Sequence, residues 1–103
     1  MAEKHFMDVL TEEAPDAAKA FFNLADFLRD HTGLDEKTFQ LIYIAIKTSV
    51  GEAGAVAAHA AYAKKAGATR DEVLGAVLIT LMTNGVHGLQ SCLIPALEAY
   101  DNA

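Results

Sequence analysis

The sequence predicts an all-α protein, and three observations support that prediction. Nearly every segment repeats its apolar residues with helical spacing. Alternation with a period of two, rich in β-branched residues, is absent over any useful length. Residues that cap or end helices, such as Asp35, Gly67 and Thr69, fall between the periodic segments. Because 103 residues suffice for one hydrophobic core, we expect a single compact domain, residues 1–103, of about six helices.

The first two helices are predicted over Glu3–Leu10 and from Pro15 to about Gly33. Proline is tolerated in a first helical turn, where backbone N–H groups have no acceptor within the helix. Glycine suits the left-handed position that follows a helix end. The second helix carries an apolar stripe formed by Ala18, Phe21, Phe22, Ala25 and Leu28.

The next two helices are predicted from Asp35, as N-cap, to about Ser49, and from about Glu52 to Ala66. Apolar residues cover most of the circumference of the helix that ends near Ser49, so we expect this helix to be buried nearly all round. The latter is rich in alanine, which allows another helix to approach its backbone closely. The apolar residues of the former are Phe39, Leu41, Ile42, Ile44, Ala45 and Ile46.

Two more helices complete the predicted fold. Thr69 and Glu72 have the spacing of a capping box, so a fifth helix is expected to begin there and to run to about Thr83. The dipeptide Asn84–Gly85 should end it. A last helix is predicted from about Val86 to Tyr100. Pro95 lacks a backbone N–H, so it should kink or split this helix near Ile94.

The charge pattern excludes some classes of partner. Fourteen acidic against eight basic residues give a formal net charge of −6, and no basic cluster exceeds Lys64–Lys65, so no nucleic acid is expected to bind. No charged residue lies between Val73 and Leu97, but the most apolar part, up to Met82, is too short to cross a membrane. A charge-free stretch of this size is better explained by contact with a partner subunit, so we expect a homo-oligomer.

The N-terminus and the cysteine content predict a cytoplasmic protein. Residues 1–5 lack the basic segment and the long apolar block of a secretory signal peptide. Cys92 is the only cysteine, which agrees with a reducing compartment and excludes an internal disulfide. We expect Cys92 to act as a small buried hydrophobic residue.

His59 is the strongest candidate for chemistry, because histidine titrates near neutral pH and can serve as general acid or base. Glu52 precedes it by seven residues, on the same helical face and about 10 Å away along the axis. The two could flank a small ligand or a water. Structural roles remain open for both: a buried histidine bonded to a neighbouring helix, and a carboxylate favoured by the helix dipole.

His87 is the third candidate, although the sequence does not give its distance from His59. Glu52, His59 and His87 are suitable metal ligands by type, but their spacing matches no metal-binding motif. We therefore expect neither a metal nor another cofactor. Three further polar residues on apolar helices could line a cleft with His59 or make structural hydrogen bonds: Gln40, Lys47 and Tyr62.

The segments Gly51–His59 and Ala66–Glu72 resemble the signature of the carboxymuconolactone decarboxylase family, which includes the alkylhydroperoxidase D-like proteins. The likeness covers roughly Asp35–Tyr100, with its parts in the family's order. The resemblance implies an alkylhydroperoxidase D-like fold. It also implies assembly into a homotrimer or homohexamer.

The resemblance implies site chemistry that this sequence retains only in part. In the family's redox branch, two cysteines precede the histidine by seven and four residues, and those positions hold Glu52 and Ala55. The proton-relaying glutamate of that branch is replaced by Gln40. In the decarboxylase branch, a carboxylate usually lies four residues before the histidine, and that position is again Ala55.

Three functions therefore remain open. The first is an acid/base enzyme acting on a small organic acid or lactone, with His59 transferring the proton and Glu52 as its partner. The second is the peroxiredoxin-like, alkylhydroperoxidase-type activity that the resemblance implies, although the cysteine pair is missing. The third is a non-catalytic oligomeric or ligand-binding protein in which the former site is filled.

Overall fold

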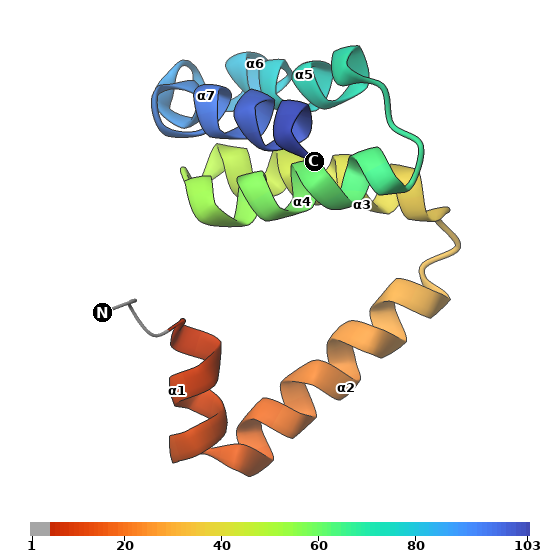
Figure 1. Ribbon diagram of the computed structural model, residues 1–103, viewed down its shortest axis with the longest axis vertical. Coiled ribbons are helices and arrows are strands. Elements are labelled where there is room, and N and C mark those ends of the chain that lie inside the picture. Colours follow the sequence, from red (N-terminus) through yellow and green to blue (C-terminus); the bar gives the residue numbers. More distant parts are fainter. Residues whose placement is uncertain (1–4) are drawn as a thin grey trace. The chain divides into compact units, whose positions relative to one another are not determined.

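The computed structural model of the protein describes residues 5–103. Contacts between residues divide the chain after Gly33 into an N-terminal unit and a C-terminal unit that begins at Leu34 (Figure 1). Every regular element in the described part is an α-helix, which confirms the predicted all-α class. The assignment of residues 1–103 to a single domain stays a prediction.

The N-terminal unit consists of α1 (Phe6–Glu13) and α2 (Pro15–His31), which pack against each other. The predicted start of the first helix at Glu3 lies outside the described residues, and α1 continues beyond Leu10. Pro15 is the first residue of α2, as predicted. Gly33 follows the end of α2 with a φ of 78°, the left-handed conformation expected there.

Most of the apolar stripe of α2 is uncovered in this unit. Ala18 is buried, whereas Phe21 and Phe22 are 52% and 46% exposed. Two helices joined by one residue offer each other a single contact face, so they cannot cover aromatic side chains on every side. The large apolar side chains exposed in this unit are Phe6, Val9, Phe21, Phe22, Leu24, Phe27 and Leu28.

The C-terminal unit contains five helices in two layers. Figure 1 shows α3 and α4 in one layer and the later helices in a second layer next to it, and α3 packs directly against α4. Helix α4 packs most extensively against α7 and α3, while α5 packs against α7 and α3. The five helices are α3 (Glu36–Ser49), α4 (Ala53–Lys65), α5 (Arg70–Leu78), α6 (Thr80–Asn84) and α7 (His87–Asn102).

The hydrophobic core of this unit lies between the layers. Helix α4 contributes Val56, Ala60 and Ala63, all fully buried, and the small alanines allow α7 and α3 to approach its backbone closely. The Tyr100 hydroxyl donates a hydrogen bond to the Ala68 carbonyl over 2.8 Å, which ties the end of α7 to the loop after α4. The complete cluster is Ile44, Val56, Ala60, Ala63, Ala68, Val73, Val77, Cys92 and Ala96.

Both predicted helix caps are present. The Asp35 carboxylate accepts a hydrogen bond from the Thr38 backbone N–H over 2.7 Å. At the start of α5, the Glu72 N–H donates to the Thr69 hydroxyl over 3.0 Å, and the Thr69 N–H donates to the Glu72 carboxylate over 2.8 Å. This reciprocal pair is a capping box, which satisfies backbone donors that lack a helical acceptor.

The prediction that the third helix is buried nearly all round is wrong. The face of α3 that carries Gln40, Ile44 and Thr48 is buried. On its outer face, Ile42 and Ile46 are 43% and 60% exposed. Within the C-terminal unit, the helices that pack against α3 cover its Gln40, Ile44 and Thr48 face and leave Ile42 and Ile46 exposed.

Two further helix boundaries differ from the sequence-based expectation. The fifth helix was predicted to run to about Thr83. In the structure α5 ends at Leu78, and a separate helix, α6, follows Ile79 and runs to Asn84. The Thr80 hydroxyl donates to the Val77 carbonyl over 2.7 Å, and such bonds compete with the helical ladder. Gly85, with a φ of 70°, ends α6 as predicted. Pro95 was predicted to kink or split the last helix; the split does not occur, since α7 is continuous through Pro95.

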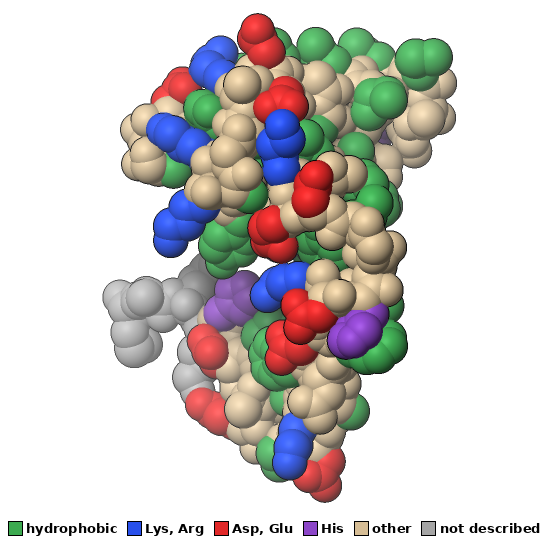
Figure 2. All heavy atoms as spheres, turned by 90° about the vertical axis from the view of Figure 1, so that its right-hand side faces the viewer, with side chains coloured by type: hydrophobic (Ala, Val, Ile, Leu, Met, Phe, Trp, Pro, Cys, Tyr) green, Lys and Arg blue, Asp and Glu red, His purple; other side chains and the backbone are tan. Residues whose placement is uncertain are grey.

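The charge-free stretch Val73–Leu97 is divided between core and surface. Val73 and Val77 are buried, whereas Met82 and Ile94 are 88% and 66% exposed. Apolar side chains, in green in Figure 2, reach the surface in several places. Among residues 5–103, no helix has both the length and the apolar content needed to cross a membrane.

Replacing Gly88 tests the contact between α7 and α3. A Cβ added at Gly88 would clash with the Thr48 carbonyl oxygen, which is backbone and cannot move aside cheaply. We expect Gly88→Ala to lower the free energy of unfolding by about 1–3 kcal/mol or more, measured by urea denaturation. Gly75→Ala is the matched control, because a Cβ there meets nothing within 4 Å and alanine favours the helix. Equal stability of both variants would contradict this packing.

The capping box predicts a loss of stability in acid. The backbone hydrogen bond from Thr69 and the ion pair with Lys37, at 3.1 Å, hold the pKa of Glu72 below its ordinary value of 4.5. A lowered folded-state pKa stabilises the protein above pH 4.5, and this stabilisation is lost as the pH falls through the lower folded value. Glu72→Gln should therefore be less stable than the unmodified protein near neutral pH. The difference should shrink in urea titrations below pH 4.5.

The acid effect should be specific to Glu72. Glu98→Gln removes another carboxylate, an exposed one on α7, and serves as the control. A Glu72→Gln difference that stays constant or grows in acid would contradict the assigned role of the capping box.

Candidate functional site

His59 lies on α4, half-buried between two tyrosine rings. The Tyr43 ring of α3 stacks on the imidazole, with ring centroids 3.7 Å apart and an interplanar angle of 19°. Tyr62, one turn further along α4, meets the imidazole edge-on, with centroids 5.1 Å apart at 83°. The predicted proximity of Tyr62 to His59 is confirmed. The two rings fix the plane of the imidazole, and His59 as a whole is only partly buried.

A row of polar contacts runs from His59 to the start of α3. His59 Nδ1 lies 2.6 Å from Gln40 Oε1, and Gln40 is 1% exposed. Gln40 Nε2 donates to Glu36 Oε1 over 2.9 Å. Glu36 was not predicted as part of this site, although its spacing of four residues before Gln40 on a helix is the signal for such a contact.

Tyr43 also adjoins an ion pair. Lys47 Nζ lies 5.9 Å from the centre of the Tyr43 ring and 3.6 Å from Glu52 Oε2. Glu52 is the residue that precedes α4, its side chain is 57% exposed, and it makes no capping hydrogen bond. Burial of Glu52 beside His59, which would have favoured acid/base work by this carboxylate, is not observed. Instead, Lys47 contacts both Glu52 and the Tyr43 ring. It thereby links Glu52 to the His59 cluster, which consists of His59, Gln40, Tyr43 and Tyr62.

His87 is exposed at the first position of α7, beside the loop between α3 and α4. A Cβ added at Gly51 in that loop would lie 3.2 Å from His87 Nε2. His87 is therefore near the residue that precedes Glu52. Across residues 5–103, no three His, Cys, Asp or Glu side chains are grouped so that they could hold a metal ion.

Cys92 belongs to the hydrophobic core and is fully buried. Its Sγ lies 3.5 Å from the Ser91 hydroxyl oxygen. The prediction that it acts as a small buried hydrophobic residue is confirmed. A thiol in this position is not accessible to a peroxide from solution.

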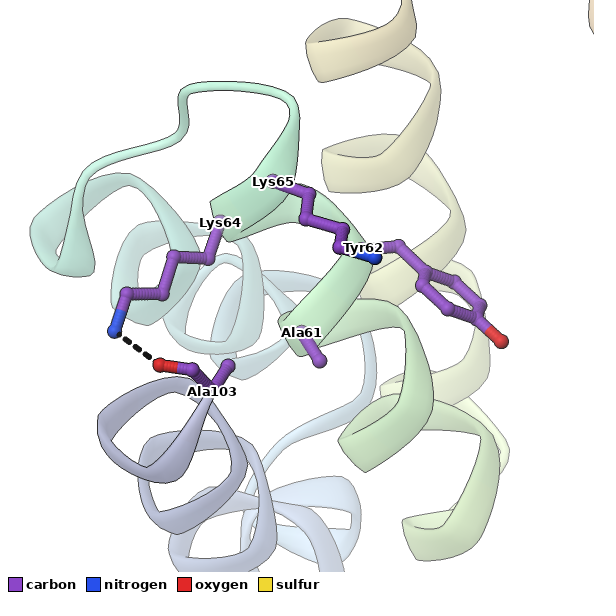
Figure 3. A pocket seen from close by; sticks show the side chains of 5 residues that line it. All are labelled: Ala61, Tyr62, Lys64, Lys65 and Ala103. Carbon is purple, nitrogen blue, oxygen red and sulfur yellow. Dashed lines mark hydrogen bonds between the residues drawn. The ribbon is translucent and has the colours of Figure 1, made fainter.

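A hollow of about 360 Å³ lies at the C-terminal end of α4, lined by Ala61, Tyr62, Lys64, Lys65 and Ala103. Figure 3 shows Lys64 reaching towards Ala103 while Tyr62 extends from the same helix in the opposite direction. Lys64 Nζ donates to the carbonyls of Tyr100 and Ala103, each over 3.0 Å. Lys64 is thus engaged in tying down the end of the chain, and the hollow lacks the convergent polar groups of a ligand site.

The side chains around His59 provide distinct chemical capabilities. An imidazole can serve as general acid or base, and the tyrosine neighbours of His59 keep its ring in one orientation. Lys47 supplies a positive charge that can bind a carboxylate. Gln40 supplies an oriented amide that does not titrate. The arrangement suits proton transfer to or from a small anionic molecule.

Comparison with known families supplies an independent finding. Residues 15–98 match the sequence model of the Carboxymuconolactone decarboxylase family. The match runs from the first residue of α2 into α7 and includes all of the side chains in contact with His59 described above. A comparison with curated proteins and one with solved structures gave no match.

Proposed function

Since this chain belongs to the carboxymuconolactone decarboxylase family, we propose that it is an acid/base enzyme acting on a small organic acid or lactone. The observation that carries the proposal is the placement of His59. Its imidazole lies between the Tyr43 and Tyr62 rings, and its Nδ1 contacts the Gln40 side-chain oxygen. A histidine held in one orientation and still partly open to solvent can reach a bound molecule with a defined ring nitrogen.

The reaction we propose is decarboxylation of a carboxylated lactone. The bond between the substrate carbon and its carboxylate breaks, CO2 leaves, and the electron pair stays on the substrate. His59 in its charged form then donates a proton to that carbon and recovers one from water. Overall, one carboxylate is replaced by one hydrogen, so no oxidant or reductant is consumed.

Lys47 and Glu52 would serve binding rather than proton transfer. Lys47 adjoins the Tyr43 ring and can bind a substrate carboxylate that is not lost. Glu52, at 3.6 Å, would orient Lys47 while the site is empty. His87, beside Gly51, is a candidate for binding the far end of the substrate.

The two alternatives have less support. Peroxiredoxin-like activity needs an accessible thiolate, whereas Cys92 is fully buried and the family's cysteine positions hold Glu52 and Ala55. A non-catalytic protein with a filled site would enclose His59, whereas this imidazole is only half-buried.

We also propose that the protein is a homo-oligomer, a trimer or hexamer. Large apolar side chains are exposed in the charge-free stretch, where Met82 is 88% and Val86 61% exposed. A second copy of the chain would cover such a surface at a free-energy gain. A cytoplasmic location stays a prediction from the sequence.

Assay with carboxymuconolactone tests the proposed reaction. We expect the unmodified protein to release CO2 from it, and we expect His59→Gln to lower turnover by roughly 10²–10⁴-fold, the usual contribution of a general acid. His31→Gln, at an exposed histidine of α2, is the matched control and should retain full activity. Circular dichroism should show that both variants are folded.

Two results would contradict the acid/base proposal. One is turnover that survives in His59→Gln. The other is consumption of peroxide with a dithiol donor that disappears in Cys92→Ser, which would establish the peroxidase alternative instead.

A charge placed in the exposed apolar surface tests assembly. We expect light scattering after size-exclusion chromatography to give a multiple of the chain mass of 11.0 kDa. Met82→Glu should shift the protein towards the monomer, because a carboxylate in a dry interface is costly. Gln90→Glu adds the same charge at an exposed polar position of α7 and should leave assembly unchanged. A protein that is monomeric at all concentrations would refute the proposal.

A further inference from the structure

Glu36 is a charged residue that contacts the His59 cluster through Gln40. The proposed reaction gives Glu36 no role. It is the first residue of α3, directly after the N-cap Asp35, and it is exposed. Its carboxylate accepts a hydrogen bond from the Gln40 side chain over 2.9 Å. Gln40 in turn contacts His59 Nδ1 at 2.6 Å.

The chemistry of these groups determines which way the Gln40 amide points. Near neutral pH a glutamate is ionised, and an ionised carboxylate can only accept hydrogen bonds. The amide of Gln40 must therefore present its NH2 group to Glu36. Because Gln40 is 1% exposed, water does not compete for this orientation. The amide oxygen is then the atom that faces His59.

The orientation of the amide determines the tautomer of His59. The Gln40 oxygen can only accept, so Nδ1 of His59 must carry a hydrogen to make the 2.6 Å contact. In a neutral imidazole with its hydrogen on Nδ1, the lone pair is on Nε2. Nε2 is consequently the nitrogen that gains and loses the exchangeable proton.

We infer that Glu36 is a positioning residue, which acts through the Gln40 amide to keep the His59 proton on Nδ1 and the basic lone pair on Nε2. The tautomer follows from the contacts alone, whereas its value for catalysis rests on the proposed acid/base function. The contact that links Glu36 to the imidazole in this arrangement is the Gln40 amide, which cannot titrate.

Reversing the hydrogen-bonding character of residue 36 tests the inference directly. A lysine ammonium can only donate, so in Glu36→Lys the Gln40 oxygen should turn towards residue 36 and its NH2 group towards His59. Nδ1 then becomes an acceptor. We expect the neutral ring to change from the Nδ1–H to the Nε2–H tautomer. Long-range 1H–15N spectra of 15N-labelled protein measure this directly, with the His59 signals assigned from His59→Gln.

Control variants separate this effect from general changes of charge. Asp71→Lys makes the same charge change at another exposed first-turn carboxylate, in α5, and should keep the Nδ1–H tautomer. Glu36→Gln retains an acceptor oxygen at position 36, so His59 should keep the Nδ1–H tautomer in this variant as well. Turnover of carboxymuconolactone should fall roughly tenfold in Glu36→Lys, which is part of the roughly 10²–10⁴-fold that general acid/base catalysis contributes. It should be largely retained in Glu36→Gln.

The possible outcomes distinguish this inference from the proposed function. An unchanged Nδ1–H tautomer in folded Glu36→Lys, or loss of that tautomer in Asp71→Lys, would overturn the positioning role whatever the activity. A changed tautomer in Glu36→Lys with unaltered turnover would support the positioning of the ring and overturn the acid/base role of Nε2.

Discussion

The close approach of α4 to α7 and α3 is the constraint on which the C-terminal unit depends. Side chains no larger than alanine at positions 60 and 63, both fully buried, keep the backbones of these helices near one another. The same closeness appears where Gly88 of α7 meets the Thr48 carbonyl of α3. Because α3 and α4 are held at short distance, side chains from both can form one compact cluster. The contact between Gln40 and His59 is a direct result.

Helix type and most helix ends could be predicted from the sequence, because local chemistry determines them. Proline at the start of α2, the caps at Asp35 and Thr69, and the left-handed glycines act within a few residues of where they stand. The extent of burial could not be predicted in the same way. The outer face of α3 is apolar by composition but exposed, because exposure depends on what packs against a helix and not on its own periodicity.

The candidate site was predictable for His59 and its neighbour Tyr62, since helical spacing places residues three apart on one face. It was predictable only in part for Gln40, Lys47 and Glu52. Their residue types indicated polar roles, but the pairing of Lys47 with Glu52 across the loop between two helices required coordinates. Glu36 was missed because a carboxylate in a first helical turn already has a sufficient electrostatic explanation.

Tyrosine placement gives the protein a built-in optical reporter. The chain has no tryptophan and three tyrosines, so its intrinsic fluorescence is dominated by tyrosine. Tyr43 and Tyr62 both contact His59, while Tyr100 is bonded to the Ala68 carbonyl. Two of the three chromophores therefore border the same imidazole. Occupation of the space around His59 should change the intrinsic emission without any added label, so ligands can be screened before a substrate is known.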